Sequence, residues 1–160
     1  MDARQAIRCG LEMAQHIATA YVNDLTDEQL MLRPHPQCNH INWQLGHLIV
    51  SENHLIGKVA GYPMPALPDG FAEKYTKETQ SSDNPADFAT KDELLRLAAE
   101  QRAGTLQALE RVTDEELDRP TGLDYAPTVG ALFSMQGSHW LMHAGQWVIV
   151  RRQLGKPPLF

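Results

Sequence analysis

The stretch that decides the fold reads TVGALFSMQGSHWLMHAGQWVIVRRQLG and covers residues 128–155. It has the helical periodicity of apolar residues at intervals of three and four. Gly155 closes the stretch, and Pro157 and Pro158 follow it, which is a typical helix end. The sequence therefore predicts a helix from about Thr128 to Leu154.

One face of this predicted helix is polar in its middle and apolar toward both ends. Four polar side chains share about 80° of the helix circumference: Gln136, His139, His143 and Gln146. Burying four such groups without partners costs on the order of 1–3 kcal/mol each, so something should satisfy them. A metal ion held by His139 and His143, which lie four residues apart, is one answer. The alternative is two histidines that are hydrogen-bonded or exposed.

Three further segments show helical periodicity, over about residues 3–23, 41–59 and 90–112. The third of them opens with Thr90 and Glu93, the pattern of a capping box. No comparable stretch alternates apolar and polar residues with period two. The sequence therefore predicts an all-α fold, with one domain over residues 1–160 in which four helices form a bundle.

Two similar short motifs support the pairing of these helices. LTDEQL at residues 25–30 is followed by Arg33-Pro34, and VTDEEL at residues 112–117 is followed by Arg119-Pro120. The similarity indicates either a common helix-opening pattern or two helix–turn–helix halves packed face to face. Between the second and third helices, residues 61–90 form a Pro- and Gly-rich connection, far longer than the ~2–8 residues usual in bundles. Such a length allows a crossover between parallel helices, or a lid over one end.

The second predicted helix offers a third metal ligand. His40, His47 and His54 follow one another at intervals of seven residues and share one face. Each interval rises about 10.5 Å along the helix axis, so we expect only one of them to join His139 and His143 on one ion. Spacing alone does not choose among the three.

Absent motifs narrow the chemistry of such a site. Trp140, Leu141 and Met142 separate the paired histidines, so the glutamate of an HExxH zinc protease is missing. No Glu-x-x-His motif of a ferritin-like two-metal bundle occurs either. An ion held by three neutral imidazoles keeps open positions and its full positive charge. That arrangement suits the activation of water or a thiol, because the ion lowers their pKa.

Composition limits the partners and the location. The 160 residues are 42% apolar and 21% charged, and 20 acidic against 14 basic residues give a net charge of −6. No basic run extends beyond Arg151-Arg152, so we expect no nucleic-acid partner. No stretch approaches ~18 apolar residues, and the first ten residues mix charged and polar side chains, so we expect no membrane partner and a cytoplasmic location. Cys9 and Cys38 form no CxxC motif and are expected to be free thiols.

Two motifs resemble those of the DinB-like superfamily. They are NWQLGHL at residues 42–48 and HWLMHAGQ at residues 139–146, the second followed by Arg151-Arg152 and Gly155-Lys-Pro157. The resemblance implies a four-helix bundle with a long crossover connection between the second and third helices. It also implies a divalent metal held by three histidines, and it selects His47 as the partner of His139 and His143.

The resemblance further implies a metal-dependent enzyme. Better-understood members and relatives of that superfamily include thiol-dependent S-transferases that use bacillithiol or similar low-molecular-weight thiols. We therefore expect either an S-transferase with a thiol cosubstrate or a hydrolase, acting on a small-molecule substrate. Three imidazoles accept Zn, Ni, Fe, Mn or Co. A non-catalytic metal-binding helical bundle with a stress-response or structural role is the alternative.

Four more side chains are candidates to orient a substrate or the ligands: Gln136, Gln146, Ser51 and His54. Ser51 and His54 follow His47 by about one and two helical turns. A simpler interpretation places the glutamines in a polar bundle interior and the other two on the helix surface. A homodimer is compatible with a bundle of this size, although no exposed stripe demands one.

Overall fold

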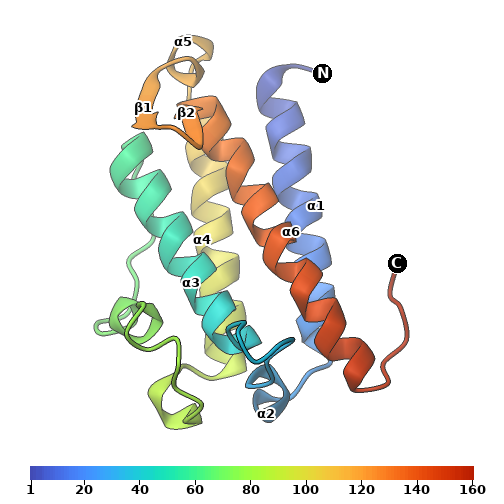
Figure 1. The fold of residues 1–160 in the computed structure, drawn as a ribbon. Coiled ribbons are helices and arrows are strands. Elements are labelled where there is room, and N and C mark those ends of the chain that lie inside the picture. The colour runs from blue at the N-terminus through green and yellow to red at the C-terminus, as the bar shows by residue number, and fades with distance from the viewer.

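Four long helices lie side by side in the computed structural model, which describes residues 1–160 (Figure 1). The long helices are α1 (Ala3–Asn23), α3 (Ile41–His54), α4 (Lys91–Arg111) and α6 (Val129–Gln153). The shorter elements are α2 (Asp27–Leu30), the π-helix η1 (Leu55–Ala60), the 3₁₀ helices η2 (Ala72–Tyr75) and η3 (Pro85–Asp87), α5 (Asp114–Leu117), and the strands β1 (Pro120–Leu123) and β2 (Ala126–Thr128). The predicted helical fold is confirmed. None of the helices combines the length and apolarity that a membrane span requires.

The long helices pack as two parallel pairs. Helices α1 and α6 run in the same direction and come close where Gly137 lies against the backbone of Gly10. Helices α3 and α4 are also parallel, since Asn42 hydrogen-bonds Ala89 just before α4 and Glu52 pairs with Arg102 further along. Helix α1 is antiparallel to α4, and α3 is antiparallel to α6. Because α1 and α3 each contact both α4 and α6, α1 and α3 lie diagonally opposite each other (Figure 1).

The connection over residues 61–90 returns the chain from the end of α3 to the end of the molecule where α3 began (Figure 1). It is a crossover between parallel helices, which is the first of the two arrangements that its length allows. Tyr75 anchors it to α3: its hydroxyl donates to Asn42 Oδ1 at 3.2 Å and accepts from the Ala89 amide at 3.0 Å. The ring of Tyr75 packs on Gly46, where a side chain would collide with it.

The two similar short motifs form the same local structure. Thr26 caps α2 and Thr113 caps α5, each in a reciprocal capping box with the residue three positions later, Gln29 or Glu116. Helix α2 connects α1 to α3, and α5 connects α4 to α6, so each short helix connects two diagonally opposite long helices. The capping box predicted at Thr90 is only half formed, because Thr90 accepts from the Glu93 amide but receives no return bond from the Glu93 side chain.

Two further details differ from the sequence prediction. The second predicted helix reaches about residue 59 as expected, but its last turns widen into η1 and end at Gly61, whose φ of 85° is left-handed. A small antiparallel hairpin, β1–β2, precedes α6 where an all-α fold was predicted. Its strands have four and three residues, too few for a period-two pattern to be detected in the sequence.

Candidate metal centre

Three histidine rings meet between α3 and α6. The ring of His47 lies 5.3 Å from that of His139 and 5.7 Å from that of His143, between ring centroids, and the two α6 rings are 5.1 Å apart. One nitrogen of each ring lies within 4.8 Å of the others. Zinc–imidazole bonds are about 2.0–2.1 Å long, so that spread is only slightly more than twice one bond length. The three histidines could therefore hold one divalent ion once small side-chain rotations bring their nitrogens closer together.

The other two histidines of the second predicted helix have different positions. His40 is fully buried and caps α3, since its Nδ1 accepts from the Trp43 amide at 3.0 Å and its Nε2 lies 3.2 Å from the Ser82 carbonyl. His54 is the last residue of α3 and is exposed. Neither belongs to the cluster, because one interval of seven residues carries each of them two turns away from His47.

Gln44 determines which nitrogen of His143 is free. The Gln44 Nε2 atom donates to the Asn39 carbonyl at 2.6 Å, which identifies Oε1 as the acceptor. That oxygen lies 2.8 Å from Trp147 Nε1 and 2.9 Å from His143 Nδ1. Because Oε1 can only accept, Nδ1 of His143 carries the proton, and Nε2 of the neutral ring keeps its lone pair for a metal.

Trp43 supports His47 from the side. The two rings stack with 5.1 Å between centroids and 7° between planes. The indole N–H of Trp43 donates to Thr79 Oγ1 at 3.1 Å, so the connection over residues 61–90 holds the stacking partner in place. The tryptophan therefore packs against the site and shields one face of the His47 ring.

Burial favours the neutral form of all three rings. Burial lowers the pKa of His47, and it lowers the pKa of His139 and of His143 to about 4. The proximity of the other histidines adds to the last two shifts, because a second positive charge nearby is unfavourable. Neutral imidazole is the form that binds a metal, so no proton has to be displaced at neutral pH.

The DinB superfamily model matches residues 11–147, which include all three histidines. The chain belongs to the DinB superfamily. A solved structure described as a conserved protein from Enterococcus faecalis is similar to this DinB superfamily protein with a TM-score of 0.68 and 15% identity. The match covers 98% of this chain and 99% of the other, so the two share a fold. No curated protein matches the sequence.

The four further candidates of this DinB superfamily chain differ in position. Gln146 is linked to the site, because its Oε1 accepts from Gln44 Nε2 at 3.1 Å. Gln136 is fully buried, but its Nε2 donates to the Leu132 carbonyl and its Oε1 has no partner. Ser51 is half-buried and makes no side-chain hydrogen bond, and His54 is exposed. No hydrogen bond joins these last three to the histidine cluster.

Sequence reasoning missed a buried ion pair next to the site. Glu52 on α3 and Arg102 on α4 are 0% and 1% exposed. Their side chains form two hydrogen bonds, of 2.9 and 3.0 Å, and Trp140 of α6 donates to Glu52 Oε2 at 2.8 Å. The only signal in the sequence was that Glu52 lies in the same predicted helix as His47. That position does not show whether the glutamate forms a buried ion pair or is a charge on the surface.

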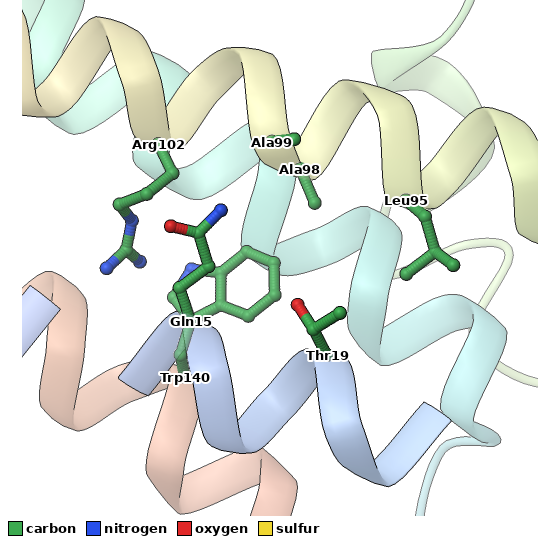
Figure 2. Close-up of a pocket in the computed structure, with 7 residues that line it drawn as sticks. All are labelled: Gln15, Thr19, Leu95, Ala98, Ala99, Arg102 and Trp140. Atoms are coloured by element: carbon green, nitrogen blue, oxygen red, sulfur yellow. The ribbon is translucent and has the colours of Figure 1, made fainter. Parts of the chain in front are cut away.

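A pocket of about 140 Å³ lies between α1 and α4 (Figure 2). The Trp140 indole reaches into it from α6, beside the Arg102 guanidinium, and Gln15 and Thr19 of α1 flank the ring (Figure 2). Trp140 thus spans the interior, because it also holds Glu52 of α3 through its N–H group. Its neighbour in sequence is the candidate ligand His139.

Proposed function

We propose that this DinB superfamily protein is a divalent-metal-dependent enzyme acting on a small molecule, as a thiol-dependent S-transferase or as a hydrolase. The supporting observation is the cluster of His47, His139 and His143, whose ligand nitrogens lie within 4.8 Å of one another without a carboxylate among them. A divalent ion held there would supply Lewis acidity, which lowers the pKa of a thiol or of water toward neutrality.

The ligand set favours chemistry that needs a strong positive charge. Three neutral imidazoles leave the charge of the ion uncompensated and, in a tetrahedral arrangement, leave one position for a substrate or nucleophile. Glu52 does not serve as a general base, because each of its carboxylate oxygens already accepts two hydrogen bonds. The proton of the nucleophile therefore leaves to solvent or to the substrate.

The surrounding residues orient the ligands and limit solvent on one side. Gln44 holds His143 with its Nε2 free, and Trp43 covers a face of His47. The three histidines themselves are only half-buried, so a small molecule can approach them. Cys9 and Cys38 lie outside the cluster. A thiol nucleophile would therefore come from a low-molecular-weight cosubstrate of the bacillithiol type.

The test combines metal analysis with turnover. The purified protein should contain one equivalent of Zn, Ni, Fe, Mn or Co by elemental analysis, and should conjugate bacillithiol or another small thiol to electrophiles, or hydrolyse esters or amides. His143→Ala should abolish both metal retention and turnover. His54→Ala is the matched control, since it removes an exposed histidine of α3 and should change neither.

The outcomes separate the candidate functions. Thiol-dependent loss of an electrophile supports the S-transferase, and turnover that needs metal but no thiol supports the hydrolase. One equivalent of metal without any metal-dependent turnover would reject the enzyme and favour the non-catalytic metal-binding bundle. Absence of metal after reconstitution would reject both.

A further inference from the structure

We propose that Glu52 is a positioning residue for the metal centre. Through its hydrogen bond with Trp140 it fixes the rotation of α6 relative to α3. The inference rests on the proposed function only in so far as the three histidines bind a metal. Glu52 belongs to α3, five residues after His47, and Trp140 belongs to α6, next to His139. The hydrogen bond between them therefore joins the two helices that carry the ligands.

The carboxylate of Glu52 is fully engaged. Arg102 donates to Oε1 from Nε and to Oε2 from Nη2, Thr105 donates to Oε1 at 2.7 Å, and Trp140 donates to Oε2. Arg102 is itself held by α1, since its Nη1 donates to the Leu11 carbonyl at 2.8 Å. The carboxylate thus joins α3, α4 and α6 directly, and Arg102 extends the network to α1.

This network sets the direction of the Trp140 ring. The guanidinium carbon of Arg102 lies 5.6 Å from the centroid of the Trp140 ring, so Arg102 contacts both the indole and the acceptor of its N–H group. Figure 2 shows the indole beside Arg102, between α1 and α4. A rotation of α6 about its axis would break the 2.8 Å bond from Trp140 to Glu52.

Stability alone does not explain a carboxylate at this position. Replacing a buried ion pair by well-packed apolar residues is often neutral or stabilising, because burying charges is costly. Apolar contacts, however, tolerate small rotations of one helix against another, whereas a metal centre needs its ligands within about 0.5 Å of the productive geometry. The directional bond from Trp140 to Glu52 supplies that restraint beside His47 and His139.

The experiment compares two substitutions that each remove one hydrogen bond to Glu52. Trp140→Phe keeps an aromatic ring but loses the N–H donor that joins α6 to α3. Thr105→Val keeps the side-chain shape but loses a donor on α4, which carries no ligand. Zn²⁺ affinity is measured by competition with a chromogenic chelator, and Co²⁺-substituted protein is compared by its visible absorption spectrum. Thermal unfolding of the metal-free proteins reports folding separately.

We expect Trp140→Phe to bind Zn²⁺ about tenfold more weakly, in the range that indirect supports of metal ligands show, and to alter the Co²⁺ spectrum. Thr105→Val should keep the wild-type affinity and spectrum. Equal Zn²⁺ affinity and identical Co²⁺ spectra for Trp140→Phe and the wild type would overturn the positioning role. So would an equal loss of affinity in both variants.

The same experiment keeps this inference apart from the proposed function. A wild-type protein that binds Zn²⁺ but catalyses nothing would reject the enzyme and leave the positioning role standing. A folded wild-type protein that binds neither Zn²⁺ nor Co²⁺ would overturn both. Glu52→Ala is less informative, because it leaves the Arg102 charge buried without a partner and is expected to impair folding.

Discussion

The side-chain oxygen of Gln44 lies 2.9 Å from Nδ1 of His143, and this contact decides which nitrogen of the ring can bind a metal. The histidine comes from α6 and the glutamine from α3, 99 positions earlier in the chain. The same oxygen accepts from Trp147, so one side chain on α3 orients two residues of α6.

Replacing Gln44 should weaken metal binding. We expect Gln44→Ala to lower Zn²⁺ affinity about 10- to 100-fold, because an unrestrained His143 ring no longer presents Nε2 in one tautomer and orientation. Gln146→Ala is the control, since it removes one of the two acceptors of Gln44 Nε2, leaves the Asn39 carbonyl in place and should cause a smaller loss. Chelator competition measures both. Unchanged affinity in Gln44→Ala would show that the ring needs no such support.

Gly46 should be intolerant of any side chain. A Cβ atom there would lie 2.2 Å from the Tyr75 ring, so Gly46→Ala should force the ring or the helix to move and cost about 1–3 kcal/mol or more of unfolding free energy. Gly10→Ala is the matched control in α1, because nothing lies within 4 Å of its added Cβ. It should stabilise the helix by about 0.5–1 kcal/mol. Urea denaturation compares the two, and equal stabilities would contradict the packing of Tyr75 on α3.

The metal-free protein should lose stability in mildly acidic solution. The unfolded chain protonates its histidines near pH 6.5, whereas burial holds the pKa of His139 and of His143 at about 4 in the folded state. Between these values the unfolded state binds more protons, so the free energy of unfolding decreases as the pH falls from about 6.5 to 4. Urea denaturation across this range measures the slope.

A double variant isolates the contribution of these two rings. His139→Gln/His143→Gln retains every other titrating group, so its stability should depend less steeply on pH over the same range. A slope identical to that of the wild-type protein would mean that the rings are protonated alike in the folded and unfolded states.

The buried ion pair should show strong coupling. Arg102→Met or Glu52→Leu alone leaves one buried charge unpaired, and we expect each to cost about 3–5 kcal/mol. The double variant should be less destabilised than the sum of the single variants, because it removes both charges together. A double-mutant cycle by urea denaturation measures this, and additive losses would show that the two side chains act independently.

Local patterns were sufficient for the helices. Apolar periodicity placed the long helices within a few residues, and the two Thr-Asp-Glu motifs, interpreted as a possible helix-opening pattern, do open the short helices α2 and α5. The β1–β2 hairpin was missed because its short strands carry no detectable alternation. At Thr90 the predicted capping box is only half formed, because the Glu93 side chain makes no return bond to the Thr90 backbone.

The candidate site was only partly accessible from the sequence. Helical spacing places His139 and His143 together, since residues four apart share a face, but it left His40, His47 and His54 open. The resemblance to the DinB-like superfamily favoured His47. The structure brings that residue to the other two, while His40 caps α3 and His54 is exposed.

What the amino-acid sequence determined by itself is the set of helices and the i, i+4 histidine pair, because both depend on interactions within a few residues of chain. Only the tertiary structure decided that Gln44 orients His143 and that Glu52 joins α3, α4 and α6. Such contacts depend on which helix faces meet and at what rotation. That choice is made by packing among segments that are about 100 residues apart in the chain, and no local pattern records it.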